Sequence, residues 1–334
     1  MNFYIDGGAN WGNTLRLAED LFPNRCAYQN SSCWRTVAFE ASPFIQPFVE
    51  QQTRWLNGEL ENEPDVCLPR SGSTPHLNRF APLVGCPNST SASEEAMRRC
   101  MFVRFDGELR KLKPSTALNS STLVHERLAG VLNSRPGSFT HIPAAVGTQN
   151  AFTHIYTSRK QDIRGGATPR PSNEQSGDPA YHVHDFVVPV VDVASWIVSV
   201  ARPDDFVFLK LDVEGAEHGL LRRLEQLGGG RLIDAVALEC HGSLAHTGPC
   251  GQTHALLRRW QTRGTLVFNE SSYGGVDNAT RNVGLSSACV ERVLRAEHTH
   301  PPSPALHTVH RHYETFLAKM ASMWPFGRAT VHPK

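Results

Sequence analysis

Short runs of apolar residues alternate along this chain with longer stretches in which apolar residues recur every three or four positions. The first pattern is typical of strands buried on both faces, and the second of helices that bury one face. The predicted strands cover residues 3–5, 34–40, 139–146, 206–212, 233–239 and 265–269. The predicted helices cover about residues 13–22, 43–58, 118–132, 193–200, 216–227 and 253–263. Because strands and helices of these lengths alternate, we predict an α/β fold with an open, doubly wound and mostly parallel sheet.

Two stretches interrupt this alternation. Residues 59–114 contain six prolines and three cysteines, and residues 158–181 are rich in glycine, proline and polar side chains. Both are interpreted as irregular surface insertions. We therefore predict one domain over residues 1–290, followed by a His- and Pro-rich extension over residues 291–334 with a helix near residues 307–320. Ligands of such sheets bind beyond the carboxyl ends of the strands, so the residues at those ends are candidates for function.

Composition excludes several classes of protein. Hydrophobic residues make up 40% of the chain and charged residues 19%, values typical of a globular rather than a disordered protein. The net charge of +1 gives no basic surface for nucleic acid, so no nucleic-acid partner is expected. The most apolar stretch, residues 187–200, is too short to span a membrane and is interrupted by Pro189 and Asp192. We therefore expect no membrane span in this chain.

The cysteines and glycosylation sequons leave the compartment open. Eight cysteines include no CxxC pair, so neither a zinc ribbon nor a thioredoxin-type site is indicated. Five N-x-S/T sequons and an even number of cysteines are compatible with a lumenal or secreted protein whose natural leader is missing from this chain. In that case Cys26 and Cys33 are expected to form a local disulfide. A cytoplasmic protein with accidental sequons fits the same residues.

The first predicted strand is followed by the pattern D-x-G-x-N-x-G, formed by Asp6, Gly8, Asn10 and Gly12. Glycines allow the backbone to approach a ligand closely and to turn tightly before a helix. The dinucleotide fingerprint G-x-G-x-x-G would need a third glycine. An acidic residue in the loop is unfavourable beside a pyrophosphate, but it suits a cationic sulfonium with an amino-acid tail. Glu40 ends the second strand, where acidic side chains bind ribose hydroxyls, so the loop and Glu40 together favour a nucleoside cofactor.

A group of charged residues lies at the end of the strand at residues 206–212. A central parallel strand is usually apolar on both faces, yet Lys210 and Asp212 interrupt this one. A simple salt bridge between Lys210 and Asp212 would explain the pair. For Asp212 and Glu214 we favour a catalytic role, because the strand end opens on the ligand crevice. For Glu217 we expect only a favourable interaction with the dipole of the following helix.

The next predicted strand ends in the sequence Leu-Glu-Cys-His-Gly at residues 238–242. Glu239 and His241 share one face of this strand and are expected to neighbour Asp212, so both are candidate catalytic residues. Two carboxylates and a histidine at a crevice could form a general base with its orienting groups, or oxygen-rich ligands for a divalent metal ion. A zinc site is disfavoured, because the cysteines and histidines of residues 240–250 have no standard ligand spacing.

At these residues the sequence resembles the FkbM family of methyltransferases. The matching motifs, in family order, are IDGGANWGN, AFEASP, IPAAVG, VPVVDV, FLKLDVEGAE and ALECHG. They cover about residues 3–270 apart from the insertions, and the KxDxEGxE segment is the most specific of them. Two departures are visible. Ala41 replaces a proline that often follows the glutamate at the end of the second strand. The insertion at residues 59–114 is large, and it prevents the methyl acceptor from being inferred from the sequence.

The resemblance implies a seven-stranded, Rossmann-like methyltransferase fold, with S-adenosylmethionine as methyl donor and usually a hydroxyl oxygen as acceptor. Carried over by position, eight residues would bind the cofactor. These are Asp6, Gly8, Asn10 and Gly12 for the methionine part, Glu40 for the ribose, Ala145 and Val146 for the adenine, and Asp212 for the transferred methyl group.

We therefore predict an S-adenosylmethionine-dependent methyltransferase that methylates a hydroxyl oxygen. The acceptor is expected to be a small molecule or a glycan, and candidates are a glycan, a lipid or a secondary metabolite. A divalent metal ion is compatible with the candidate residues but not established by them. Two alternatives stay open, a non-catalytic cofactor-binding protein of the same fold and a nicotinamide-dependent oxidoreductase. The missing third glycine and the acidic Asp6 count against the oxidoreductase. The intact charges at Glu40, Asp212 and Glu214 argue against a protein that has lost its catalytic activity.

Overall fold

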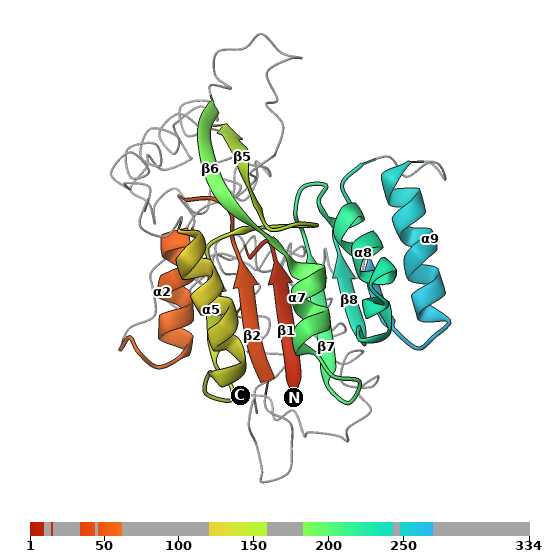
Figure 1. Ribbon diagram of the computed structural model, residues 1–334, viewed down its shortest axis with the longest axis horizontal. Helices are drawn as coiled ribbons and strands as arrows, with labels where there is room; N and C mark the ends of the chain where they lie inside the picture. Colours follow the sequence, from red (N-terminus) through yellow and green to blue (C-terminus); the bar gives the residue numbers. More distant parts are fainter. Residues whose placement is uncertain are drawn as a thin grey trace, which may run out of the picture.

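The computed structural model describes residues 1–9, 15, 34–43, 46–61, 120–158, 183–242 and 248–269. These residues form a six-stranded sheet in which neighbouring strands are parallel, in the order β3-β2-β1-β7-β8-β9 (Figure 1). Its strands are β1 (Asn2–Gly7), β2 (Trp34–Phe39), β3 (Phe139–Ile142), β7 (Phe206–Leu211), β8 (Ala235–Leu238) and β9 (Leu266–Asn269). All six lie where the sequence pattern predicts strands, because apolar runs of this length suit a sheet that is buried on both faces.

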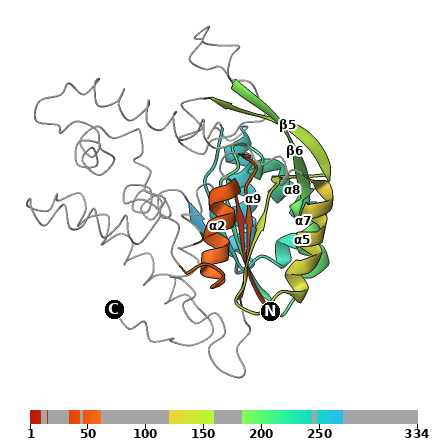
Figure 2. The same ribbon diagram turned by 90° about the vertical axis from the view of Figure 1, so that its left-hand side faces the viewer.

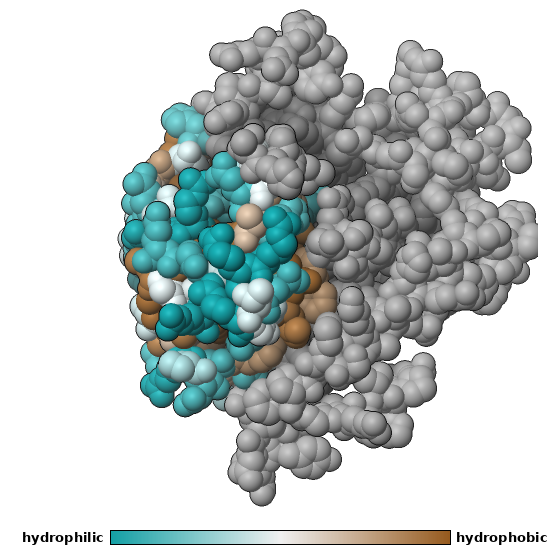
Figure 3. Space-filling model, turned by 90° about the vertical axis from the view of Figure 1, so that its right-hand side faces the viewer, coloured by the Kyte–Doolittle hydropathy of each residue, from teal (hydrophilic) through white to brown (hydrophobic). Residues whose placement is uncertain are grey.

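Helices cover both faces of this sheet. Those in the described residues are α2 (Gln46–Leu56), α5 (Ser121–Asn133), α7 (Val193–Val200), α8 (Glu217–Gln226) and α9 (Pro249–Gln261), with a 3₁₀ turn, η4 (Gly229–Arg231), before β8. Helix α2 lies on the opposite side of the sheet from α5 and α7 (Figure 2). Helix α9 buries Leu256, Leu257 and Trp260, and the described face at its end of the molecule is mainly hydrophilic (Figure 3). This amphipathic pattern is what the sequence periodicity predicts.

Alternating side chains of the strands build the core. Phe3 and Ile5 of β1 point to one face, where they belong to the same buried cluster as Ile197 of α7. Tyr4 points to the other face and packs edge to face against Phe208 of β7, with ring centroids 5.3 Å apart. Because a register shift of one residue would exchange these faces, the core fixes which residues stand at the carboxyl ends of the strands.

The structure differs from the prediction at residues 139–146, which were expected to form one strand. The chain leaves the main sheet after Ile142, because Pro143 cannot donate a ladder hydrogen bond. The next strand, β4 (Ala145–Gly147), belongs to a second sheet of order β4-β6-β5. In it β5 (Ala151–Ser158) and β6 (Val183–Asp192) pair antiparallel and extend beyond the main sheet (Figure 1). The described residues therefore contain two sheets rather than the one expected.

The strand order reverses beside β1. The chain proceeds from β1 to β2 and β3 on one side, then crosses to β7, β8 and β9 on the other. Such a switch opens a crevice at the carboxyl ends of the central strands. This is the predicted Rossmann-like arrangement, with six strands in the described part of the main sheet where the resemblance implies seven. Within the described residues, no helix is both long and apolar enough to cross a bilayer.

The division into a domain and an extension stays a prediction. The two insertions predicted at residues 59–114 and 158–181 fall almost entirely outside the described residues, and so does the extension at residues 291–334.

Candidate functional site

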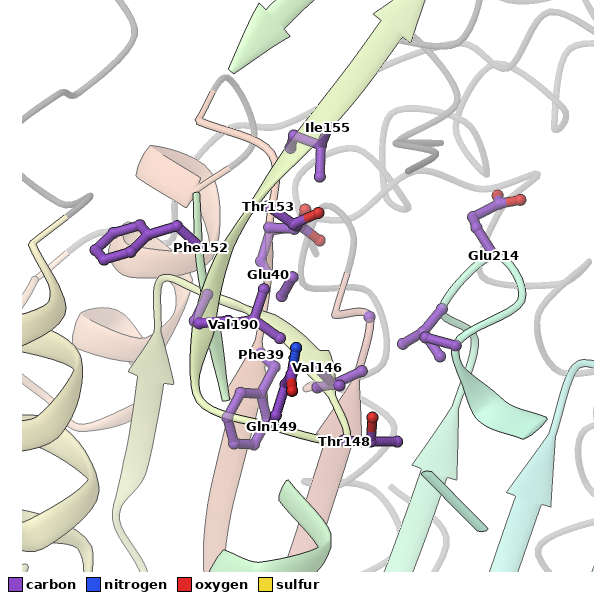
Figure 4. A pocket seen from close by; sticks show the side chains of 18 of the residues that line it. Phe39, Glu40, Val146, Thr148, Gln149, Phe152, Thr153, Ile155, Val190 and Glu214 are labelled. Carbon is purple, nitrogen blue, oxygen red and sulfur yellow. The ribbon is translucent and has the colours of Figure 1, made fainter. Parts of the chain in front are cut away.

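A cavity of about 320 Å³ lies at the carboxyl edge of the main sheet (Figure 4). Three strand ends contribute to its wall, through Gly8 after β1, Glu40 after β2 and Asp212 after β7. Residues 144–149 and the beginning of β5 form another part of the wall. The cavity therefore lies at the topological switch point, where ligands of open α/β sheets bind, and its volume falls in the range of small-molecule sites.

The loop after β1 packs tightly against its neighbours at Gly8. The φ angle of Gly8 is +89°, and a Cβ atom there would lie 1.9 Å from the carbonyl oxygen of Asp212. The backbone N–H groups of Gly8 and Ala9 both donate to the carbonyl oxygen of Phe39, at 3.1 and 2.8 Å. Only glycine fits this position, and Gly8 itself lines the cavity, so the wall of the cavity is bare backbone at this point.

The turn after β2 holds Glu40 at the cavity. Glu40 is buried, and its Oε1 accepts a hydrogen bond from the backbone N–H of Ser42 at 2.7 Å. Gln46, the first residue of α2, donates from Nε2 to the carbonyl oxygens of Glu40 and Ala41, at 3.2 and 3.1 Å. The hydrogen bond from Ser42 therefore fixes the carboxylate, and Gln46 fixes the backbone of the turn that carries it.

Asp6 lies deeper than the sequence-based expectation placed it. It is fully buried and does not line the cavity, and its Oδ1 lies 3.1 Å from Nζ of Lys210. Lys210 also donates to the carbonyl oxygen of Gly8 at 2.5 Å, while Oδ2 of Asp212 is 3.9 Å away. The expected bridge from Lys210 to Asp212 is therefore mainly a bridge from Lys210 to Asp6, its partner in the strand register. This buried pair ties the glycine loop to β7.

Four carboxylates surround His241 at the ends of β7 and β8. Nε2 of His241 lies 3.7 Å from Oε2 of Glu214 and 3.8 Å from Oδ1 of Asp212. The same nitrogen lies 3.9 Å from Oε1 of Glu239. Nδ1 of His241 lies 3.3 Å from Oε1 of Glu217, an ion-pair contact rather than a well-directed hydrogen bond. Asp212 and Glu214 also line the cavity, so the cluster adjoins the cavity through these two residues.

This environment makes His241 a cation at neutral pH. The contact with Glu217 raises the pKa of His241 most, burial opposes this, and Glu214 and Asp212 raise it further, to about 9 from the ordinary 6.5. The pKa of Glu214 is raised above its usual value, mainly by burial and in part by the neighbouring carboxylates, against the opposing effect of His241. The cluster therefore combines an imidazolium with a carboxyl group that holds its proton more readily than usual.

Comparison with known families decides what this site belongs to. Residues 6–263 match the family model described as the methyltransferase FkbM domain. The chain belongs to the FkbM methyltransferase family. It is therefore a methyltransferase, as the motifs predict. Comparisons with curated proteins and with solved structures found no match.

The structure of this FkbM-family methyltransferase brings together most of the residues that the sequence singles out. Five of the eight residues expected to bind the cofactor line the cavity: Gly8, Glu40, Ala145, Val146 and Asp212. Asp6 supports the loop through Lys210, while Asn10 and Gly12 lie outside the described residues. The binding roles of all eight stay predictions.

Sequence reasoning found Ala145 and Val146 of β4 but missed the residues that follow β4 in the wall of the cavity. Thr148, Gln149 and Thr153 line the cavity but carry no recognisable motif. Thr148 and Gln149 lie in the turn between β4 and β5, and Thr153 lies in β5, which pairs with β6 across the insertion. A pairing over such a distance has no local signal. The one available signal was Pro143, which interrupts the predicted strand before β4.

The loop that carries His241 is held from its far side by a disulfide and a histidine. Cys240 and Cys250 form the disulfide, which joins the end of β8 to the start of α9. The two sulfurs are bonded to each other, and a disulfide sulfur supplies no thiolate to a zinc ion. His218 donates from Nε2 to the carbonyl oxygen of His241 at 2.6 Å, and the Thr253 hydroxyl donates to Nδ1 of His218 at 2.8 Å.

Proposed function

We propose that this protein transfers the methyl group of S-adenosylmethionine to a hydroxyl oxygen of a glycan, a lipid or a secondary metabolite. The observation that carries the proposal is the cavity, which has Glu40 on one side and Glu214 on the other (Figure 4) and is also lined by Asp212. A carboxylate after the second strand suits ribose hydroxyls. Carboxylates across the cavity suit a ligand with a positive charge at that end.

The chemistry of the lining residues fits this cofactor. The exposed backbone at Gly8 allows a close approach by the methionine part, and Ala145 with Val146 offers an apolar surface to the adenine. When bound, S-adenosylmethionine supplies a methyl group on a positively charged sulfur, which is already a good leaving group. The protein therefore has to hold the acceptor and remove its proton.

Glu214 is the best-placed proton acceptor in this proposal. The sequence favours His241 as the base, because an ordinary histidine titrates near neutral pH. With a pKa of about 9, however, His241 already carries the proton that a base would have to accept. Glu214 lines the cavity, is 41% exposed at its side chain, and has a raised pKa. We assign the base to Glu214, and to His241 the role of a fixed cation that holds the carboxylates together.

A divalent metal ion offers a second route to the same deprotonation. Ligand atoms of Asp212, Glu214 and His241 lie within 4.8 Å of one another. Binding a metal ion there would require His241 to release its proton, which its raised pKa opposes. The proposal therefore expects methyl transfer to be indifferent to EDTA. Loss of activity with EDTA that magnesium or manganese restores would favour the metal route instead.

Two measurements test the proposal as a whole. S-adenosylmethionine should raise the melting temperature and bind with a dissociation constant in the micromolar range, about −8 kcal/mol, whereas NAD should do neither. Labelled S-adenosylmethionine should then transfer its methyl group to a component of glycan, lipid or small-molecule pools. Stabilisation by NAD alone would favour the oxidoreductase. Cofactor binding without transfer to any pool would favour the non-catalytic alternative.

An oxidising compartment belongs to the same proposal. The disulfide between Cys240 and Cys250 is of a kind that persists in secretory compartments, which agrees with the five sequons. The expected pair Cys26 and Cys33 lies outside the described residues. Expression of the full gene in a eukaryotic host, followed by glycosidase treatment, should increase the electrophoretic mobility of the protein. Unchanged mobility would point to the cytoplasm.

A further inference from the structure

Glu217 makes contacts that an interaction with the helix dipole does not explain. It is the first residue of α8, and its side chain is fully buried. A buried carboxylate is costly unless N–H groups satisfy its oxygens. Oε2 accepts from the backbone N–H of Gly215 at 2.8 Å, and Oε1 accepts from the backbone N–H of His241 at 2.8 Å. One carboxylate thus accepts hydrogen bonds from two loops. The first bond comes from Gly215 in the loop just before α8, and the second from His241, 24 residues after Glu217.

These two loops carry the catalytic candidates. The loop at residues 212–216 places Glu214 at the cavity, and Glu214 and Gly215 both have left-handed backbone angles, with φ of +52° and +105°. This conformation is rare for a glutamate, so the turn needs a restraint from outside itself. The bond from Gly215 to Glu217 supplies one. The loop at residues 239–242 carries His241, and its backbone is fixed by the other oxygen of Glu217.

The same carboxylate also orients the ring of His241. Oε1 of Glu217 lies 3.3 Å from Nδ1 of the ring, so Nε2 is directed to the side where Asp212 and Glu214 lie. Burial raises the pKa of Glu217, but the contact with the His241 ring and the hydrogen bonds from backbone N–H groups outweigh this and lower it below the usual value. Glu217 is therefore ionised at neutral pH, and a single charged group sets the backbone of both loops and the direction of the imidazolium.

We propose that Glu217 is a positioning residue that locks the loops after β7 and β8 into one catalytic unit. The inference rests on the proposed function, because it concerns the same site. The disulfide between Cys240 and Cys250 and the hydrogen bond from His218 hold the second loop only. In the part of the chain that the structure describes, the Glu217 side chain accepts hydrogen bonds from the backbone of both loops.

The test uses Glu217→Gln, which keeps the shape of the side chain but leaves one oxygen to accept for two backbone N–H groups. The amide NH₂ then faces one of these donors. Hydrogen exchange followed by mass spectrometry should show exchange at least about tenfold faster in peptides covering residues 212–218 and 239–242, with β1 and β2 unchanged. With labelled S-adenosylmethionine and an acceptor from the screen, kcat should fall about 10–100-fold while KM for S-adenosylmethionine changes less than about threefold.

Glu225→Gln is the matched control. Glu225 lies on the same helix and accepts from Nε1 of Trp260 at 2.7 Å and from Arg263 at 3.1 Å, away from both loops. This variant loses a paired carboxylate and should leave the exchange of both loops and kcat unchanged. A role of Glu217 in stability alone would instead give faster exchange throughout the sheet and a similar pattern in the two variants.

The outcomes separate the inference from the proposed function. Wild-type exchange in both loops of Glu217→Gln, or loosening of one loop alone, would overturn the inference even if the wild-type protein binds S-adenosylmethionine. Absence of S-adenosylmethionine binding by the wild type would overturn the proposed function, whereas the exchange experiment needs no ligand. If Glu217→Gln does not fold, Glu217→Asp keeps the charge but cannot reach both donors, and the same exchange pattern is expected of it.

Discussion

Two clusters in this protein are built from the same kinds of side chain and behave in opposite ways. His141 of β3 contacts Glu50 of α2, with Nδ1 and Oε2 2.9 Å apart, and Arg127 of α5 completes the cluster. His141 is fully buried, and burial lowers its pKa, against the opposing effect of Glu50. His241, at the carboxyl ends of β7 and β8, has a pKa raised to about 9. One histidine is therefore neutral at pH 7 and the other is charged.

The partners of the two histidines explain the difference. Arg127 donates to both oxygens of Glu50, at 2.6 and 3.2 Å, and so satisfies the carboxylate that His141 contacts. Burial raises the pKa of Glu50, but its bonds from His141 and Arg127 outweigh this and hold it at about 2. Around His241 the described residues supply four carboxylates, and His241 is the cation that contacts all of them. The first cluster fastens helices to the sheet edge, and the second leaves negative charge beside the cavity.

The largest expected effect is on turnover, which a substitution in the His241 cluster should lower and one in the His141 cluster should not. His241→Ala should lower turnover by about 10²–10⁴-fold with little change in cofactor affinity, because it removes the cation that holds the carboxylates in place. His141→Ala should lower the melting temperature but leave the turnover of the folded protein unchanged. Single-turnover rates with labelled S-adenosylmethionine measure both. An equal loss of turnover in the two variants would contradict a catalytic role that only the His241 cluster has.

The second largest effect is expected in how the stability of the protein depends on pH, where the His241 cluster should differ from the His141 cluster. The pKa of His241 is higher in the folded protein than its unfolded value of 6.5, so its contribution is fully present below pH 6.5 and is lost as pH rises toward 9. The loss should be about 2–3 kcal/mol over this window. Urea unfolding at several pH values measures it, with His241→Ala as the reference. The raised pKa would be contradicted if the free energy of unfolding of the wild type fell no more between pH 6.5 and pH 9 than that of His241→Ala.

Two glutamates extend the comparison to cofactor binding. Glu40→Ala should weaken S-adenosylmethionine binding by about 1.5–3 kcal/mol, because charge-assisted hydrogen bonds to the ribose are lost. Glu50→Gln, in the structural cluster, should leave the affinity unchanged. Calorimetry on both variants is the measurement. Unchanged affinity in Glu40→Ala would reject the assignment of Glu40 to the cofactor.

The smallest expected effect lies in the structural cluster. Arg127→Leu removes the bidentate partner of Glu50 and should destabilise the protein by about 1–2 kcal/mol at pH 7. Because the pKa of Glu50 is lowered to about 2 from 4.5, its contribution is present above pH 4.5 and is lost as pH falls toward 2. The variant should therefore lose less stability over that acid range than the wild type. Urea unfolding at pH 7 and pH 3 tests both statements.

The sequence by itself determined the main sheet through its hydrophobic pattern, and the family through the motifs at the strand ends. The strands β1, β2, β7 and β8 are continuous apolar runs, and such runs have no other stable place than a sheet covered on both faces. Glu40 and Asp212 were predictable as cavity residues, since polar groups directly after buried parallel strands meet at one edge.

Only the tertiary structure decided which charged residues line the cavity and which are buried in the fold. The sequence offered a bridge from Lys210 to Asp212 and a helix dipole for Glu217. The structure places Lys210 closer to Asp6 than to Asp212 and bonds Glu217 to two loops. It also surrounds His241 with carboxylates, which raise its pKa to about 9. The physical reason is that a pKa and an ion pair depend on burial and on distances between strands. Local sequence fixes the type of each group, but packing fixes its neighbours.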